Sequence, residues 1–196
     1  GVAMTKFMYW LKNNAGKVDM TELSIGETVK GFRKAQEGFV EESFTTIAGY
    51  GPHGAIIHYH ATEETNAVVK PEGLLLVDSG GQYLEGTTDV TRTFVLGPIS
   101  AEVKLHFTTV VRSMLNLASA RFLYGCRGEN LDVLARGPLW QLGMDYKCGT
   151  GHGVGYLLNV HEGPNAFRWK MVNDVDSTAV LEEGMVLTVE PGIYIE

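Results

Sequence analysis

The sequence has few of the features that mark secreted or membrane-embedded proteins. Only two cysteines occur, Cys126 and Cys148, and there is no stretch of about 18 or more apolar residues. So few cysteines exclude a disulfide-rich scaffold, and the lack of a long apolar run excludes a transmembrane helix. The first residues also lack the basic and apolar segments of a signal peptide. We therefore expect a cytoplasmic protein with two unpaired thiols and no membrane partner.

Positive charge is also scarce. The chain has 16 Lys and Arg against 23 Asp and Glu, which gives a net charge of −7, and the basic residues form no run. Because a nucleic-acid-binding surface needs a basic patch, this balance excludes one. The 196 residues, of which 44% are hydrophobic, suffice for one globular domain or a large part of a bigger one. We expect a single domain over residues 1–196.

Apolar spacing and capping residues predict four helices. Ser24 and Glu27 have the spacing of a capping box, Ser100 is expected to cap the third helix, and Pro138 is expected to distort the fourth. The expected helices cover residues 2–12, 24–42, 101–122 and 131–143.

Alternating or continuous apolar runs predict strands between and after these helices. The segments 74–80 and 87–96 are expected to pair as a hairpin that turns near residues 83–86. Shorter strands are expected at 55–59 and 185–195. Helices followed by strands, then helices and strands again, indicate an α+β fold with an antiparallel sheet, not a doubly wound parallel sheet.

Two aspartates, Asp78 and Asp89, lie in the two arms of the expected hairpin. A turn near residue 84 places them at or near the same rung. Two carboxylates on one face of an antiparallel pair repel unless a cation lies between them or one is protonated or turned into water. Such a pair suits a divalent cation, whereas a single aspartate in a strand would more often cap a turn.

Two histidines and a glutamate follow in the second half of the chain. His152 is flanked by alternating glycines, which fit an extended segment packed closely against a site better than a phosphate loop. His161 stands near a Gly-Pro turn and is a candidate donor to a substrate carbonyl, or a structural residue of the turn. Glu190 lies between an apolar run and a Pro-Gly break, which suits a ligand, a general base or a solvent contact. His58 follows a short apolar segment and has the same two interpretations as His161.

Five segments together resemble the catalytic domain of Xaa-Pro aminopeptidases, which belong to the M24 or "pita-bread" metallopeptidases. They occur in the order of that family and span nearly the whole chain. The segments are 54–59 (GAIIHY), 78–80 (DSG), 86–93 (GTTDVTRT), 149–155 (GTGHGVG) and 190–194 (EPGIY).

The resemblance implies a fold, a reaction and a role for each residue. The fold is the pita-bread fold, and the reaction is hydrolysis of the bond between an N-terminal residue and a following proline. Asp78 would bind one of two divalent ions, Asp89 would bridge both, and His152 and Glu190 would bind the second. Manganese is the expected metal, with zinc and cobalt as alternatives. His58 and His161 would assist the tetrahedral intermediate, and Glu190 would accept the proton of the attacking water.

Two departures from the family pattern alter these expectations. Cys148 stands where family members often have a histidine that lines the proline pocket, which implies a weaker preference for proline. The family also has a further bridging glutamate beyond the Glu-Pro-Gly motif, and Glu196 is too close to Glu190 to match it. We therefore expect a part of a longer, dimeric, multidomain protein that alone binds metal weakly and has little or no activity.

Two other functions fit the same fold. One is a non-catalytic pita-bread binding module, and the other is a metal-independent hydrolase of the creatinase type. The presence of all four ligand-type residues, Asp78, Asp89, His152 and Glu190, disfavours both.

Overall fold

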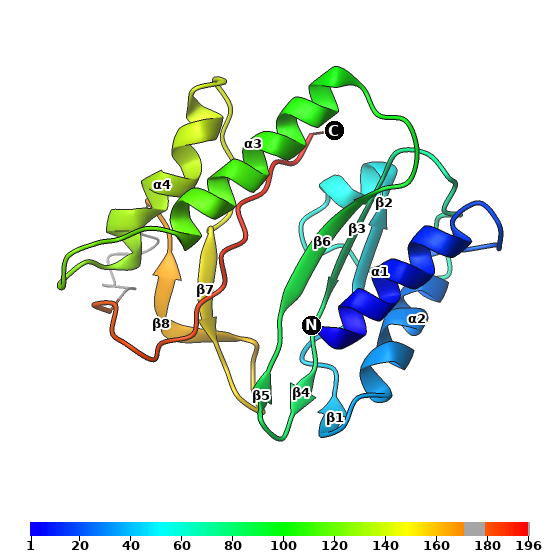
Figure 1. Cartoon of the computed structure of the whole chain (residues 1–196), viewed down its shortest axis with the longest axis horizontal. Coiled ribbons are helices and arrows are strands. Elements are labelled where there is room, and N and C mark those ends of the chain that lie inside the picture. The colour runs from blue at the N-terminus through cyan, green and yellow to red at the C-terminus, as the bar shows by residue number, and fades with distance from the viewer. Residues whose placement is uncertain (171–178, 196) are drawn as a thin grey trace. The chain divides into compact units, whose positions relative to one another are not determined.

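The computed structural model describes residues 1–170 and 179–195, which form two compact units. The first unit holds Gly1–Ile99 together with Tyr156–Leu158 and residues 194–195, and the second holds Ser100–Gly155 and the described part of Asn159–Ile193. Glu196, which the sequence analysis set aside as a ligand, lies outside the described residues. The two units are described separately below, with the element labels of Figure 1.

The first unit is built from two helices and two small antiparallel sheets. One sheet has the strand order β2-β3-β6, and the other has the order β1-β4-β5. The elements are α1 (Val2–Asn14), α2 (Glu22–Lys34), β1 (Phe39–Glu41), β2 (Ile47–Tyr50), the 3₁₀ helix η1 (Gly51–Ala55), β3 (Leu74–Ser79), β4 (Gln82–Tyr83), β5 (Gly86–Thr87) and β6 (Val90–Val95).

Helices α1 and α2 share one hydrophobic core with the β2-β3-β6 sheet, beside which they run in Figure 1. Phe7 and Ile25 from the helices and Leu75 and Val77 from β3 are fully buried in it. Burial alternates along β3, because successive side chains of a strand point to opposite faces. The intervening residue Asp78 therefore lies on the face away from this core.

The expected hairpin is confirmed, and its register is fixed over its whole length. Strands β3 and β6 pair antiparallel, and the same pairing continues from Gln82 opposite Thr87 to Tyr83 opposite Gly86. The turn therefore has Leu84 and Glu85 at its tip, within the segment that the sequence analysis expected.

The second unit combines two helices with a two-stranded sheet. Its elements are α3 (Ala101–Ala118), α4 (Gly128–Trp140), β7 (Gly151–Val154) and β8 (His161–Phe167). Ser100 caps α3 as expected, since its hydroxyl accepts from Val103 N, and Pro138 lies inside α4. Of the helices in the described ranges, none has both the length and the apolarity that crossing a bilayer would need.

Both units bear out the expected α+β class, but several local expectations were wrong. Helix α3 ends at Ala118, not near residue 122, and α4 covers residues 128–140, not 131–143. Helix α2 ends at Lys34, not near residue 42, because Gly38 adopts a positive φ and the chain continues as β1. Residues 55–59 form the end of the 3₁₀ helix η1 and a following turn, not a strand. Residues 185–195 form no regular strand, although Leu187 makes an isolated bridge with Gly153.

The N-terminus of α2 is capped by a residue that the sequence analysis did not choose. Thr21 is the N-cap, its hydroxyl accepts from Ser24 N at 3.2 Å, and the Ser24 hydroxyl accepts from Thr21 N at 2.8 Å. Ser24 is therefore the third residue of the helix and the last residue of the capping box, not its first.

This assignment predicts a difference between two alanine substitutions. Thr21→Ala removes an acceptor from the first turn of α2 and should lower the free energy of unfolding by about 1 kcal/mol. Glu27→Ala changes only an exposed side chain, so its effect should stay within about 0.5 kcal/mol. Urea denaturation followed by circular dichroism measures both values, and a larger loss for Glu27→Ala would contradict the observed cap.

Candidate functional site

The two aspartates of the first unit lie on one face of the hairpin, but not on the same rung. Asp78 pairs with Thr91, and Asp89 directly precedes β6, two residues before Thr91. Because side chains repeat every two residues along a strand, this register makes Asp78 and Asp89 diagonal neighbours on the face away from the core. The two aspartates thus share a face, as expected, but the pairing between their strands is shifted by two residues from the expected one. Both side chains are half-buried.

His58 lies in the connection between η1 and β3, with an exposed side chain and a positive φ of 57°. The neighbouring Tyr59 is buried, and its hydroxyl donates to the Glu22 carboxylate at 2.9 Å. Glu22 also accepts from Tyr50 N and Ala67 N, so one buried carboxylate is bonded to the residue before η1 and to two places within the connection. The local sequence favoured a strand here, whereas these tertiary hydrogen bonds produce a loop.

In the second unit, the glycines around His152 permit a close approach of backbone to backbone. A Cβ at Gly151 would collide with the carbonyl of Thr188, and one at Gly153 would collide with that of Glu162. The segment around Thr188 thereby runs along β7, with hydrogen bonds from Thr188 N to His152 O and from Glu190 N to Thr150 O, both 2.8 Å long. The interpretation of alternating glycines as an extended, closely packed segment is confirmed.

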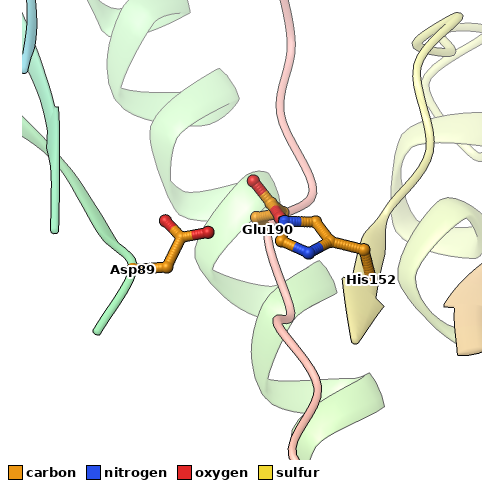
Figure 2. Close-up of side chains that lie close together, drawn as sticks. All are labelled: Asp89, His152 and Glu190. Carbon is orange, nitrogen blue, oxygen red and sulfur yellow. The ribbon is translucent and has the colours of Figure 1, made fainter. Parts of the chain in front are cut away.

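This approach brings three of the predicted residues together. His152 projects from β7 toward Glu190, and its Nε2 lies 3.0 Å from Glu190 Oε1 (Figure 2). His161, the first residue of β8, has its ring centroid 4.0 Å from that of His152. The second unit therefore presents two imidazoles and a carboxylate at one place. Asp89, also labelled in Figure 2, belongs to the first unit.

The surroundings of Glu190 favour its ionised form. Burial raises the pKa of its carboxyl, but hydrogen bonds from His152 and Thr188, together with the nearby His161, outweigh burial, so the pKa lies below its ordinary value. The Thr188 hydroxyl donates to Glu190 Oε1 at 2.5 Å. An ionised carboxylate next to a histidine can act as a metal ligand or as a proton acceptor.

A buried ionic network lies behind β7, and the sequence analysis did not identify it. Arg136, only 2% exposed, donates to Asp132 Oδ2 at 2.6 Å and to the carbonyls of Tyr146 and Cys148 at 2.6 and 2.8 Å. Thr150 is hydrogen-bonded to the other oxygen of Asp132 and to the Tyr146 hydroxyl. The network thus fixes the segment that leads into His152. Its one sequence signal is the helical i, i+4 spacing of Asp132 and Arg136.

The donor types fit a divalent metal. Carboxylates such as Asp78, Asp89 and Glu190 suit hard cations, and the imidazole of His152 suits borderline ones such as Zn²⁺ and Mn²⁺. The site residues predicted from the sequence thus lie in two groups. The hairpin of the first unit carries Asp78 and Asp89, and β7 with its neighbours in the second unit carries His152, His161 and Glu190. His58 lies apart from both groups, in its own connection.

Comparison with protein families identifies the class. The model of metallopeptidase family M24 matches residues 1–196, and the chain therefore belongs to this family. The fold is the pita-bread fold of the M24 proteins, as the likeness to solved structures below shows.

Among curated proteins, the chain is similar to proteins named aminopeptidase P and Xaa-Pro aminopeptidase. It is 43% identical to aminopeptidase P2 of Arabidopsis thaliana over 98% of this chain and 27% of that protein. It is 42% identical to Xaa-Pro aminopeptidase 1 of Dictyostelium discoideum over 98% of this chain and 31% of that protein. The chain thus spans less than a third of the length of these relatives.

Solved structures give the same result. An X-prolyl aminopeptidase from Caenorhabditis elegans, described as a cytosolic enzyme with a di-nuclear active site, matches with a TM-score of 0.91 and 39% identity over 99% of this chain and 31% of that one. An X-Pro aminopeptidase from Thermotoga maritima matches with a TM-score of 0.81 and 30% identity, over 100% of this chain and 51% of that one.

The close packing at Gly151 predicts the effect of adding one methyl group. Gly151→Ala places a Cβ against the Thr188 carbonyl, so the segment must move away from β7 and lose its hydrogen bonds with His152 and Thr150. We expect a loss of about 1–3 kcal/mol in the free energy of unfolding, together with changed imidazole NMR resonances of His152. Gly137→Ala, for which a Cβ meets open space in α4, is the matched control, and equal effects of the two substitutions would contradict the packing.

The ion pair between Arg136 and Asp145, at the edge of the buried network, predicts that the stability of the fold depends on pH. Burial raises the pKa of Asp145, but hydrogen bonds from Arg136 and from backbone lower it more, so the pKa lies below its ordinary value of 3.8. A lowered pKa contributes stability that is complete above the ordinary pKa and disappears as the pH falls through the folded-state value. Since the Asp145 side chain is 40% exposed, Asp145→Asn should cost no more than ~1 kcal/mol at pH 7.

Urea denaturation of both proteins at pH 7 and pH 3 measures this contribution. The difference between the parent protein and Asp145→Asn should shrink at pH 3. A difference that is the same at both values would show that the ion pair with Arg136 does not stabilise the fold.

Proposed function

We propose that this chain supplies the catalytic residues of a metal-dependent aminopeptidase that hydrolyses the bond between an N-terminal residue and a following proline. The observation that carries the proposal is the group formed by His152, His161 and Glu190, in a chain that matches family M24 over its whole length. The names of the similar proteins supply the substrate class, a peptide with proline in second position.

We assign Asp78, Asp89, His152 and Glu190 as the ligands of two divalent ions. The donor types of all four residues support the assignment. So does the di-nuclear site described for the Caenorhabditis enzyme, and Mn²⁺ is the proposed metal, with Zn²⁺ or Co²⁺ as alternatives. When bound, such ions would lower the pKa of a coordinated water and hold the free amine of the substrate.

The remaining site residues act on the substrate and on protons. Glu190, whose pKa is lowered, is ionised at neutral pH and can accept a proton from the attacking water at Oε1. His161 and His58 each offer an imidazole N–H to a substrate carbonyl oxygen on which negative charge develops. Cys148 takes the place of a pocket histidine, so we propose a weaker preference for proline than in relatives that have the histidine.

The same relatives bear on location and assembly. The Caenorhabditis enzyme is described as cytosolic, and we propose the cytoplasm for this protein as well. We also propose a homodimer for the full-length protein, with neither nucleic acid nor membrane as a partner. The net charge of −7 supports the exclusion of nucleic acid.

Asp89→Asn tests the metal assignment. The amide has one weakly ligating oxygen in place of a charged carboxylate, so Mn²⁺ affinity should fall at least about tenfold and hydrolysis of an Arg-Pro-Pro peptide at least about 100-fold. Isothermal titration calorimetry measures the affinity, and release of the N-terminal residue measures the activity of the full-length protein.

Asp19→Asn provides the matched control, because it makes the same chemical change at an exposed position. It should leave both quantities unchanged. Normal turnover by Asp89→Asn in millimolar Mn²⁺ would refute Asp89 as a ligand. Metal binding without hydrolysis of any Xaa-Pro peptide by the parent protein would refute the proposed reaction and leave the metal site standing.

A further inference from the structure

A buried arginine of the first unit joins the two strands that carry the aspartates. Arg33, near the end of α2, is 2% exposed. Its Nη2 donates to the carbonyl and the hydroxyl of Ser79 at 2.8 and 3.0 Å, and its Nη1 donates to the hydroxyl of Thr88 at 3.3 Å. One planar guanidinium thus reaches the last residue of β3 and a residue just before β6.

Each of these partners is the immediate chain neighbour of one aspartate. Ser79 follows Asp78, and Thr88 precedes Asp89. Because adjacent residues of a strand face opposite sides, Arg33 holds the hairpin from the core side while the two carboxylates lie on the other side. The positions of Ser79 and Thr88 therefore determine the separation of Asp78 and Asp89.

Other contacts make this part of the hairpin rigid. The Thr88 hydroxyl also accepts from Gly81 N at 3.0 Å, and Ser43 ties Gly80 to Thr88 through two further hydrogen bonds. A Cβ at Gly80 would collide with the Thr88 carbonyl, so the two strands are as close here as backbones can be. Arg33 is the member of this group that reaches both strands from a helix and with a charged side chain.

Burying Arg33 is costly for the protein. Its hydrogen-bond acceptors are neutral oxygens, its Nε has no hydrogen-bond partner among the described residues, and it takes part in none of the ion pairs found between them. A buried cation without a carboxylate loses much of its hydration energy, and an apolar side chain of similar size would often give a more stable protein. A role in stability alone therefore does not account for this residue.

We propose that Arg33 is a positioning residue that fixes the spacing of the Asp78 and Asp89 carboxylates by joining their strands from the opposite face. The inference rests on the proposed function, in which the two carboxylates share a metal centre. Arg33 itself touches neither substrate nor metal.

Arg33→Lys tests the inference, because lysine keeps the charge but cannot reach Ser79 and Thr88 with one planar group. In the metal-free protein, hydrogen exchange measured by NMR should become at least about tenfold faster at the amides of Gly81 and Thr88 than in the parent. Cobalt affinity, measured by calorimetry and by the visible absorption of the Co²⁺ protein, should fall about 10- to 100-fold. Thr88→Val removes the hydroxyl that accepts from both Arg33 and Gly81 N, so it should speed exchange at Gly81 directly and should lower Co²⁺ affinity less than Arg33→Lys does.

Val29→Ala is the matched control, since Val29 lies on the same helix, is equally buried and packs in the core. It should speed exchange throughout the first unit without a particular effect at the hairpin, and it should leave Co²⁺ affinity unchanged. Two results would show that Arg33 has only a structural role. One is that Arg33→Lys speeds exchange throughout the first unit, as Val29→Ala does, and the other is that it leaves Co²⁺ affinity unchanged. If the parent protein binds no Co²⁺, the proposed function fails, and the exchange pattern alone then decides whether Arg33 joins the strands.

Discussion

The register between β3 and β6 is the constraint on which the acidic pair depends. Asp78 stands opposite Thr91, and its neighbours in β3 are Val77, buried in the core, and Ser79, held by Arg33. A slip of one residue would turn the carboxylate of Asp78 into the core and leave Val77 outside. Burying an unpaired carboxylate costs several kcal/mol, so packing of the apolar side chains also places the aspartates. Stability and site geometry are thus set by the same alternation.

The two units secure their candidate ligands in a similar way. In each, a buried arginine from a helix donates to backbone carbonyls in the segment that leads to or follows a candidate ligand. Arg33 donates to Ser79, which follows Asp78, and Arg136 donates to Tyr146 and Cys148 in the segment ahead of His152. In each, a glycine lets a second segment come within contact of the first, at Gly80 and at Gly151. A ligand side chain can be no better positioned than its own backbone, and a guanidinium with several donors can fix more than one carbonyl at once.

The sequence predicted what depends on local pattern and missed what depends on distant partners. The hairpin, the cap at Ser100 and the packed glycines around His152 follow from periodicity and residue type, and all were confirmed. Residues 55–59 have the composition of a strand, yet Glu22, far away along the chain, draws Tyr59 into a loop. Arg33 carries no signal either, because its acceptor Ser79 is 46 positions away. Family motifs named the ligand types, whereas a motif says nothing of the residues behind them.

The two buried arginines also differ in a way that bears on what they do. Arg136 is paired with Asp132, so its charge is compensated within the second unit, and removing either partner would leave an uncompensated charge in the interior. Arg33 donates to neutral oxygens of Ser79 and Thr88, which are the chain neighbours of the two aspartates on the far face of the hairpin. Coulomb attraction acts through a thin sheet of low dielectric more strongly than through water. The positive charge behind the hairpin therefore opposes the mutual repulsion of two carboxylates on its front, which is greatest when no cation lies between them. Geometry and charge thus favour the same arrangement of the two carboxylates on this face of the hairpin.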